Sequence, residues 1–295
     1  MPELPDIVLY VDALNARITG LVLKAIRPLS PFVLRSVDPP LGALNGRIVR
    51  GVGRLGKRIV IDFDEGFHLV LHLMIAGRLR WRTPGQKAGV GPRMVLAELE
   101  FETGKLLFTE AGSKKRASMH VVHGPEALGA IHRGGVEPLE VSLEEFRQAL
   151  IAENHTLKRS LTDPRLFSGI GNAYSDEILH AARLSPLKLT QSLAEDEIAR
   201  LFDATRATLQ EWIARLKTEA GGSFPEKVTA FHSEMAVHGR FGKPCPVCGA
   251  PVQRIVYAEN ECNYCAVCQT GGRLLADRAL SRLLREDWPK RLEEW

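Results

Sequence analysis

Hydrophobic residues recur at helical spacing at the start of the chain. Ile7, Val11, Leu14 and Ile18 follow one another at intervals of three or four residues, and the series stops at Gly20. Such spacing places the four side chains on one face of a helix. The chain is therefore predicted to begin with a helix that packs against another element.

The pattern changes to short β-rich runs between Val22 and Thr109. Examples are Arg58 to Phe63, Leu69 to Leu73 and Lys105 to Thr109, and turns rich in glycine and proline separate the runs. Runs of this length and composition predict antiparallel strands. The first part of the chain is therefore predicted to be an antiparallel β-sandwich that carries an N-terminal helix.

Helical spacing returns beyond the glycines near residues 125–135. Ser142 and Ser192 each stand three residues before a glutamate and precede an apolar series, which is the form of a capping box. A helix is also predicted from Ala173 to Arg183, and leucines between Leu274 and Leu284 predict a short amphipathic helix near the end of the chain. The second part is therefore predicted to be helical.

These patterns predict an α+β protein of several domains. We expect the β-sandwich domain at residues 1–128, a helical domain at 129–240, a cysteine-rich hairpin at 241–271 and a helical extension at 272–295. The chain has 295 residues, of which 45% are hydrophobic and 25% are charged. This composition supports packed cores and excludes wholesale disorder.

No stretch of the sequence is typical of a membrane span or a secretory leader. The longest apolar stretch near the middle, Phe67 to Ala76, contains two histidines and is too short to cross a bilayer. The first six residues are acidic where a leader would be basic. We expect a cytoplasmic monomer that has no membrane partner.

The net charge of +4 is unevenly distributed. Residues 1–125 hold 18 Lys and Arg against 11 Asp and Glu, whereas residues 126–240 hold 13 against 17. A basic first part is compatible with a polyanionic partner, but many unrelated proteins show such an imbalance. The motifs must therefore identify the partner.

The cysteines form the strongest single motif. Cys245, Cys248, Cys265 and Cys268 read C-x2-C-x16-C-x2-C, a spacing typical of two turns that close a tetrahedral Zn²⁺ site. Two disulfides would be the alternative, but an odd number of cysteines in a cytosolic chain disfavours them. One structural Zn²⁺ is therefore predicted, and Cys262 is left over.

A glycine-rich segment precedes the helix predicted from Ala173. In Gly169-Ile-Gly-Asn172, the glycines permit close approach of the backbone to a phosphate, and the free amides at a helix N-terminus attract an anion. An ordinary turn in which Asn172 caps the helix has the same sequence pattern. The segment alone leaves both interpretations open.

The N-terminus is a candidate nucleophile. If Met1 is removed, Pro2 presents a secondary amine that is partly unprotonated at neutral pH. Such an amine can attack a carbonyl-like carbon and form an iminium intermediate, and Glu3 lies beside it as a possible acid. The alternative is that the prolines near the N-terminus only start a helix.

Five motifs together resemble one known family. Their order and spacing are similar to those of the formamidopyrimidine-DNA glycosylase and endonuclease VIII family over residues 2 to about 270. The resemblance implies a β-sandwich domain, a helix-two-turns-helix domain, a zinc hairpin and damaged DNA as the partner. The motifs are Pro2 to Asp6, Gly56-Lys57, His72 to Gly77, Gly169 to Tyr174 and Cys245 to Gln269.

The resemblance also implies roles for individual residues. Pro2 matches the amine that attacks the anomeric carbon of a nucleotide flipped out of the duplex. Glu3 matches the acid that assists opening of the sugar, and Lys57 matches a lysine that binds the phosphate of the lesion and aids elimination. Asn172 matches the asparagine that grips the DNA backbone.

The sequence departs from the family pattern at several positions. Asp6 replaces a glutamate, and His72 to Gly77 places Ile75 where a methionine wedge is usual. Glu110 to Arg116 replaces the segment that supplies an arginine and a phenylalanine to the opposite base, so this reader is missing or rebuilt. Asn260 stands where an arginine of the hairpin grips phosphate. His72, Ile75, Asn172 and Asn260 are therefore the expected DNA-binding residues.

The resemblance implies a bifunctional DNA glycosylase and abasic-site lyase of base-excision repair that removes oxidised bases through an iminium at Pro2. A non-catalytic protein that recognises damaged or unusual DNA on the same scaffold is the alternative. A zinc-ribbon protein of the ribosome or of transcription would not explain Pro2, Glu3 and Lys57. The preferred lesion stays open, since the residues expected to fill the hole in the duplex are absent.

Overall fold

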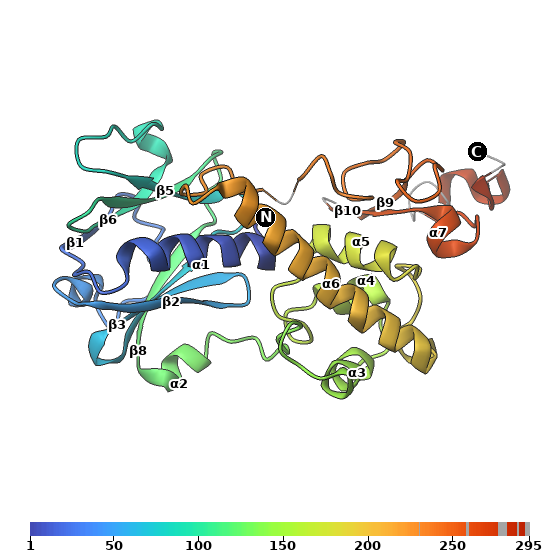
Figure 1. Ribbon diagram of the computed structural model, residues 1–295, viewed down its shortest axis with the longest axis horizontal. Helices are drawn as coiled ribbons and strands as arrows, with labels where there is room; N and C mark the ends of the chain where they lie inside the picture. Colours follow the sequence, from blue (N-terminus) through green and yellow to red (C-terminus); the bar gives the residue numbers. More distant parts are fainter. Residues whose placement is uncertain (230, 258–259, 277–281, 288, 293–295) are drawn as a thin grey trace. The chain divides into compact units, whose positions relative to one another are not determined.

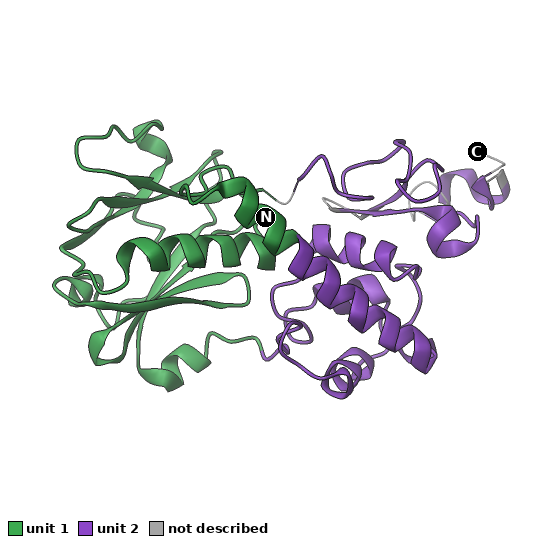
Figure 2. Ribbon diagram, viewed as in Figure 1, with its two compact units in different colours: residues 1–133, 212–229 green, residues 134–211, 230–295 purple. Residues whose placement is uncertain are grey.

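The computed structural model describes the chain except residues 230, 258–259, 277–281, 288 and 293–295 (Figure 1). It divides into two compact units (Figure 2). Unit 1 comprises Met1–Arg133 with Trp212–Thr229, and unit 2 comprises Gly134–Glu211 with Ala230–Trp295. The long helix α6 (Glu195–Ala220) contributes residues to both units.

Unit 1 begins with the predicted helix, α1 (Leu4–Ile18), which packs against two strands, β2 and β3 (Figure 1). Ile7, Leu14 and Ile18 are fully buried, as their spacing predicts, and Tyr10 completes the buried face. The helix ends at Thr19, after which Gly20 adopts a φ of +83°. The helix therefore packs through a continuous apolar face, and a capping box formed by Glu3 and Asp6 marks its start.

Two four-stranded antiparallel sheets form the rest of the unit 1 core, as predicted. Their apolar side chains meet in one hydrophobic cluster that also contains the apolar face of α1. The helix α2 (Gly124–Gly129) follows the last strand. In spatial order, one sheet is β1 (Ala25–Pro28), β6 (Val95–Glu100), β7 (Lys105–Glu110) and β5 (Gly77–Arg82), and the other is β2 (Val49–Leu55), β3 (Arg58–Phe63), β4 (Phe67–His72) and β8 (Ser118–His123).

Unit 2 is helical and carries a β-hairpin. Phe146 packs against Phe167 and Phe202, with ring centroids 4.8 and 5.4 Å away, and joins three segments of the helical core. The helices that precede α6 are α3 (Leu143–Ile151), α4 (Leu157–Thr162) and α5 (Asn172–Ala181). The hairpin comprises β9 (Gln253–Tyr257) and β10 (Asn260–Tyr264), and α7 (Ala266–Thr270) follows it. The fold class predicted from the sequence is confirmed.

One of the two predicted capping boxes is correct. Ser142 is the N-cap of α3, and its hydroxyl accepts a hydrogen bond from the Glu145 N–H at 3.3 Å. Ser192 instead lies in a 3₁₀ turn, and its hydroxyl donates to the Leu189 carbonyl at 2.8 Å. The Ala194 N–H instead donates to the Glu197 carboxylate, because α6 starts at Glu195, three residues beyond Ser192.

The tail begins with an extended segment, and residues 282–284 near the end of the amphipathic helix predicted there are helical. Leu274 is buried in an extended segment, and its N–H donates to the Lys290 carbonyl at 2.9 Å. Leu283 is 76% exposed, and Leu280 lies outside the described residues. Backbone hydrogen bonds therefore hold the start of the tail in place. The spacing of the leucines in the sequence does not predict this pairing. Among the described residues, no helix is long and apolar enough to span a membrane.

The two serines provide a matched pair of variants. Ser142→Ala should lower the free energy of unfolding by about 1 kcal/mol, because an N–H at the start of α3 loses its cap. Ser192→Ala removes the same hydroxyl from an exposed position that caps no helix and should change stability by less than about 0.5 kcal/mol. Urea unfolding followed by circular dichroism measures both. Equal losses would contradict the assignment of the caps.

Candidate functional site

The first residues of the chain are buried at the start of α1. Pro2 is buried, and Glu3 is only 2% exposed. In this chain Met1 acylates the Pro2 nitrogen, so the Met1 α-amine is the free one. The chain end thus lies inside unit 1 rather than on a solvated arm.

Charged groups of both signs surround this terminal amine. The pKa of the Met1 amine is lowered, mainly because burial disfavours its charged form. The carboxylates of Glu3 and Asp6 oppose the shift, whereas the positive charges of Arg78 and Lys57 favour it. The structure therefore gathers Glu3 and Lys57, two of the predicted catalytic residues, around the first residues of the chain. It adds Arg78, for which the sequence carries no local signal.

Asp6, which stands where the family pattern has a glutamate, is buried next to the first residues of the chain. Its side chain is fully buried, its Oδ2 accepts the Glu3 N–H at 2.8 Å, and its Oδ1 has no hydrogen-bond partner. Burial raises the pKa of Asp6 to about 7, and the nearby Glu3 carboxylate acts in the same direction. A carboxyl group that exchanges a proton near neutral pH thus lies directly under the chain end.

Lys57 lies in the tight turn between β2 and β3. Gly56 precedes it with a φ of +62°, a conformation that residues with a side chain rarely adopt. Lys57 itself is half-buried. The Gly56-Lys57 motif therefore has a structural cause, since the glycine permits the turn that presents the lysine.

His72 ends β4 in a strongly cationic environment. Burial lowers its pKa to about 4, and the charges of Arg58, Lys57 and His120 contribute. Its Nδ1 accepts the Met74 N–H at 3.1 Å. His72 is therefore neutral at pH 7 with its proton on Nε2, and it offers a hydrogen-bond donor without a charge.

Ile75 lies at the tip of the turn that follows. Its side chain is 57% exposed, as an inserting wedge requires. A Cβ added to Gly77 would lie 2.2 Å from the Leu73 carbonyl oxygen, so only glycine fits there. The Arg78 guanidinium donates to the carbonyls of Ile75 and Gly77 at 3.2 and 2.6 Å. The Arg78 side chain therefore holds the turn that presents Ile75.

The loop that follows β7 is organised by one carboxylate. Glu110 is 2% exposed and accepts the N–H groups of Arg116 and Ala117 at 2.9 and 3.2 Å. Lys115 donates to the Glu110 carbonyl, while Lys114 and Arg116 are exposed. The segment without the expected arginine and phenylalanine is thus a defined loop that presents basic side chains.

Asn172 begins α5 in unit 2. Gly171 is the N-cap and Asn172 is the first helical residue, so the interpretation of Asn172 as an ordinary cap is wrong. Its Nδ2 donates instead to the Glu261 carbonyl of β10 at 2.8 Å. Asn172 therefore links the helix to the hairpin, which a sequence motif could not reveal.

Sequence analysis missed a buried polar network behind Asn172. Asp176 is fully buried and accepts hydrogen bonds from Lys158 Nζ at 2.6 Å, His238 Nδ1 at 2.8 Å and the Asn263 N–H at 3.1 Å. Lys158 also donates to the Asn172 carbonyl at 2.6 Å. These residues are far apart in the sequence, so no local pattern identifies them.

Asn260 is the first residue of β10, and its backbone pairs with Tyr257. The Asn260 side chain lies outside the described part of the chain. Its expected contact with DNA stays a prediction.

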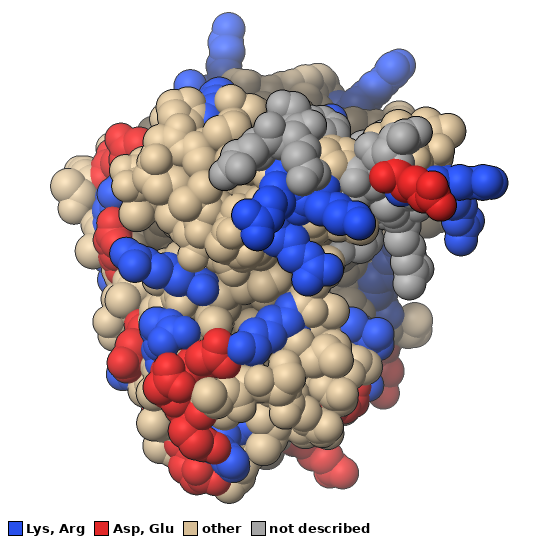
Figure 3. All heavy atoms as spheres, turned by 90° about the vertical axis from the view of Figure 1, so that its right-hand side faces the viewer, with Lys and Arg blue, Asp and Glu red and all other residues tan. Residues whose placement is uncertain are grey.

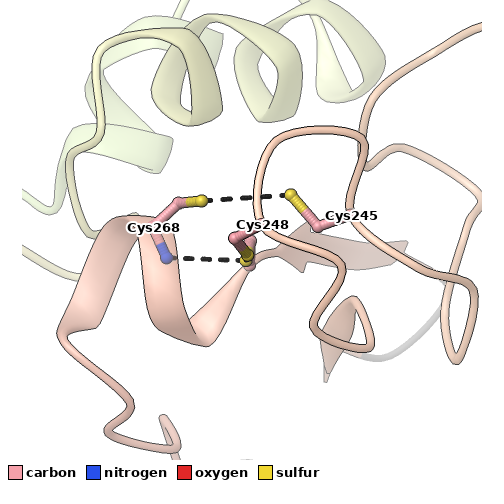
Figure 4. Close-up of side chains that lie close together, drawn as sticks. Cys245, Cys248 and Cys268 are labelled. Atoms are coloured by element: carbon pink, nitrogen blue, oxygen red, sulfur yellow. Dashed lines mark hydrogen bonds between the residues drawn. The ribbon is translucent and has the colours of Figure 1, made fainter.

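The four predicted metal ligands converge in unit 2. The Sγ atoms of Cys245, Cys248, Cys265 and Cys268 all lie within 4.8 Å of one another. Cys245 and Cys268 face each other at 3.9 Å (Figure 4), and Cys248 and Cys265 are 3.4 Å apart. Four thiolates around a tetrahedral Zn²⁺ would be about 3.8 Å apart. The site therefore fits one structural Zn²⁺, as predicted.

Two hydrogen-bond donors that face the thiolate sulfurs support this geometry. The Cys268 N–H donates to Cys265 Sγ at 3.5 Å, and His180 Nε2 lies 3.2 Å from Cys245 Sγ. Such outer contacts orient ligands and disperse the charge of thiolates. Cys262 instead packs with Ile255 in a separate apolar cluster, where burial raises the pKa of its thiol. The prediction that Cys262 is left over is confirmed.

Family models match both units. The model of the formamidopyrimidine-DNA glycosylase N-terminal domain matches residues 1–116. The model of the formamidopyrimidine-DNA glycosylase H2TH domain matches residues 135–222. The formamidopyrimidine-DNA glycosylase of Pelotomaculum thermopropionicum is 33% identical over 91% of this chain and 99% of its own length. That of Thermus thermophilus is 31% identical over 92% of this chain and all of its own length.

Solved structures of formamidopyrimidine-DNA glycosylases are similar to the structure of this chain. The Lactococcus lactis formamidopyrimidine-DNA glycosylase, non-covalently bound to DNA with an abasic site, is 26% identical with a TM-score of 0.78. The match covers 91% of this chain and 99% of that one. Its complex with DNA containing the formamidopyrimidine lesion of deoxyguanosine has a TM-score of 0.80 at 27% identity, over 91% of this chain and all of that one.

The metal assignment predicts different outcomes for two neighbouring cysteines. Cys265→Ser should abolish stoichiometric zinc binding, because three thiolates no longer close the site, whereas Cys262→Ser should retain about one Zn²⁺ per chain. Elemental analysis of the purified full chain measures the metal content. Zinc retained in Cys265→Ser and lost in Cys262→Ser would reverse the ligand assignment.

The raised pKa of Asp6 predicts a pH-dependent stability. In the unfolded chain the carboxyl ionises near its ordinary pKa of 3.8, whereas in the folded chain it ionises near 7. Its stabilising contribution is therefore present below pH 3.8 and is lost as the pH rises through about 7. Between pH 5 and 8, Asp6→Asn should gain about 2 to 3 kcal/mol relative to the natural protein, at 1.36 kcal/mol per pKa unit.

Asp12→Asn is the matched control for this measurement. Asp12 lies on the same helix, but its side chain is 48% exposed and forms an ion pair with Lys217. Its replacement should leave the pH profile nearly unchanged, because an exposed ion pair contributes little to stability. Urea unfolding of the three proteins at pH 5 and 8 makes the comparison. A parallel profile for Asp6→Asn and the natural protein would refute the buried, proton-exchanging Asp6.

Proposed function

Because the chain belongs to the formamidopyrimidine-DNA glycosylase family, we propose that it is a bifunctional DNA glycosylase and abasic-site lyase that removes oxidised bases. In this proposal Pro2 is the nucleophile after removal of Met1. The observation that carries it is the buried chain end, around which Glu3, Asp6, Lys57 and Arg78 are gathered. Glu3 and Asp6 also form the capping box of α1, but an ordinary helix start needs neither Lys57 nor Arg78.

The surroundings of the chain end suit an amine nucleophile. Burial together with the positive charges of Arg78 and Lys57 lowers the pKa of the amine that is present, that of Met1. The same groups would act on the Pro2 amine once Met1 is removed. A larger unprotonated fraction at neutral pH makes the amine a better nucleophile.

The reaction that follows has a defined course for each proton. The Pro2 nitrogen forms a bond to the anomeric carbon of the sugar, the bond to the base breaks, and the base takes up a proton from water as it leaves. The Glu3 carboxylate takes the proton that the Pro2 nitrogen loses and gives it to the ring oxygen as the ring opens and the iminium forms. The Glu3 carboxylate then removes a proton from the neighbouring sugar carbon, and the electron pair left there expels the 3′ phosphate. Lys57 binds a phosphate next to this carbon and stabilises its charge.

Other residues of the proposal position the DNA. The Nε2–H of His72 and the Lys57 ammonium bind backbone phosphates, and Ile75 enters the base stack beside the extruded nucleotide. In unit 2, Asn172 and the hairpin hold the backbone. Zn²⁺ takes no part in the chemistry, because four thiolates leave no open position at the metal.

The test is borohydride trapping on DNA that contains an abasic site, with intact mass to establish whether Met1 is present. Protein without Met1 should form a covalent adduct, because reduction fixes the iminium, and Pro2→Gly should greatly weaken trapping. Pro5→Ala, which changes the next proline of the same segment, should still be trapped. Strong trapping by protein that retains Met1 would contradict Pro2 as nucleophile. The absence of an adduct with processed, DNA-binding protein would favour the non-catalytic alternative.

A further inference from the structure

Arg78 takes part in no proton transfer and no phosphate contact of the proposed reaction. Many Lys and Arg side chains reach the surface, as on the face that Figure 3 shows. Arg78 is half-buried instead, and it is the second residue of β5. Its guanidinium interacts with two parts of unit 1, the turn that presents Ile75 and the first residues of the chain. These two parts are far apart in the sequence.

The turn between β4 and β5 requires several contacts to keep its shape. Met74 has a φ of +53°, a conformation that a residue with a side chain rarely adopts. Such a backbone is costly, and it persists only where surrounding contacts determine it. The Gly77 N–H donates to the Leu73 carbonyl at 2.8 Å, and His72 Nδ1 accepts the Met74 N–H at 3.1 Å. These two bonds close the turn, but neither involves its tip.

Arg78 supplies the contact that reaches the tip of this turn. Its Nη1 donates to the Ile75 carbonyl at 3.2 Å and to the Gly77 carbonyl at 2.6 Å. Among the described residues, no other hydrogen bond is formed to the backbone of Ile75. The position of the exposed Ile75 side chain therefore depends on the Arg78 guanidinium.

The start of β5 also lies against the helix that follows the chain end. The Leu79 N–H donates to the Tyr10 hydroxyl of α1 at 3.3 Å, and both residues are fully buried. The Thr109 hydroxyl of β7 donates to the Arg78 carbonyl at 3.0 Å. The backbone that carries Arg78 is therefore fixed to both α1 and the sheet.

Four charged side chains have the largest effects on the amine at the chain end. Burial is the main cause of the lowered pKa of the Met1 amine, and Arg78 contributes more to it than Lys57 does. The carboxylates of Glu3 and Asp6, at the start of α1, act in the opposite direction. Arg78 is therefore the stronger of the two positive charges that disfavour the protonated amine.

We propose that Arg78 is a positioning residue, which uses one guanidinium to hold the Ile75 turn and to place a positive charge beside the amine at the chain end. The inference rests on the proposed function, in which Ile75 enters the base stack and the Pro2 nitrogen attacks the sugar of the extruded nucleotide. Arg78 touches no reacting atom. It makes the place of the wedge and the protonation of the nucleophile depend on the same side chain.

The test compares two variants of protein that lacks Met1, as intact mass establishes. Arg78→Gln removes the positive charge, and its shorter side chain cannot reach both carbonyls of the turn. Arg80→Gln is the matched control, because it removes the same charge from the same strand, where Arg80 pairs with Glu226 at 2.7 Å. Arg82 also pairs with Glu226, so this carboxylate keeps a partner in the control. Circular dichroism and the melting temperature establish that both variants fold.

The first measurement is the titration of the Pro2 amine without DNA, followed by the ¹³C shifts of Pro2 in protein labelled at proline. Loss of a nearby positive charge favours the protonated amine. The midpoint should therefore move to higher pH in Arg78→Gln and stay unchanged in Arg80→Gln. No reaction takes place, so the result does not depend on whether Pro2 is a nucleophile.

The second measurement reports where Ile75 lies in the bound duplex. The duplex contains a tetrahydrofuran analogue of the abasic site, which cannot form an iminium, and a neighbouring 2-aminopurine, whose fluorescence rises when it is unstacked. Saturating natural protein should raise the fluorescence, and Ile75→Ala should remove most of the rise. Arg78→Gln should behave like Ile75→Ala, because the turn has lost the contact at its tip. Arg80→Gln should behave like the natural protein.

The rate of borohydride trapping connects both effects to the chemistry. On abasic-site DNA, Arg78→Gln should be slowed most at low pH, by the factor by which the unprotonated fraction of its Pro2 amine falls. Where the amine is unprotonated in both proteins, a loss of about 10- to 100-fold should remain, because the nucleotide is misplaced. Arg78→Lys restores the charge, so its pH profile should return to that of the natural protein.

Changes in both the Pro2 titration and the 2-aminopurine signal of Arg78→Gln, with neither change in Arg80→Gln, support the proposal. A change in only one signal would overturn it, because Arg78 would then serve the turn or the amine alone, and so would no change in either. If no protein is trapped but both signals change as expected, the proposed lyase activity is wrong and the role of Arg78 stands. If Arg78→Gln fails to fold, Arg78→Met replaces it, since methionine fills the space of the stem without the charge.

Discussion

Unit 1 depends on the burial of the chain's own first residues. The apolar face of α1, with Ile7, Tyr10 and Leu14, is fixed in the core, and Pro2 and Glu3 follow from that packing because the helix begins directly after them. The same burial that positions the chain end also sets its protonation. It lowers the pKa of the terminal amine and raises that of Asp6, because burial favours the neutral form of both groups.

Unit 2 depends on a buried carboxylate instead of an apolar face. Asp176 joins α4 through Lys158, the segment before the cysteines through His238, and β10 through the Asn263 N–H. Removing one partner of such a group leaves a buried charge unsatisfied, which costs several kcal/mol, about 3 to 5. Glu177 adds three bonds from the N–H groups of residues 236–238. These hydrogen bonds therefore connect the helix that carries Asn172 to the hairpin and to the segment before the cysteines.

The zinc site extends this rigidity. His180 on α5 contacts Cys245 Sγ, so the helix touches the ligand set as well as the hairpin. Three independent connections, at Asn172, Asp176 and His180, thus tie α5 to the cysteine-rich segment. A Zn²⁺ ion bound by the four cysteines would therefore help to hold the hairpin against the helix.

The spacing of residues within single segments of the sequence correctly predicted several parts of the structure. The first helix, the strands at Arg58–Phe63 and Lys105–Glu110 and the four cysteines were correct, because each depends on spacing along one segment. The Asp176 network and the position of Arg78 near the chain end could not be predicted, since the residues involved meet only in the tertiary structure. Ser192 failed for a related reason. A capping sequence specifies a helix start only where the preceding backbone does not already turn.

His72 shows how burial and charge together determine what a site can offer to DNA. Its cationic neighbours and its burial keep it neutral, with a pKa of about 4. A phosphate brought next to the ring would raise this pKa by about 1 to 3 units, to at most about 7, so at least about half of the rings would stay neutral at pH 7. In the proposed function, the Nε2–H of a neutral ring would orient a phosphate without releasing a counterion, whereas Lys57 and Arg58 would supply the salt-dependent attraction. The geometry of the contact and the long-range attraction would then come from different side chains.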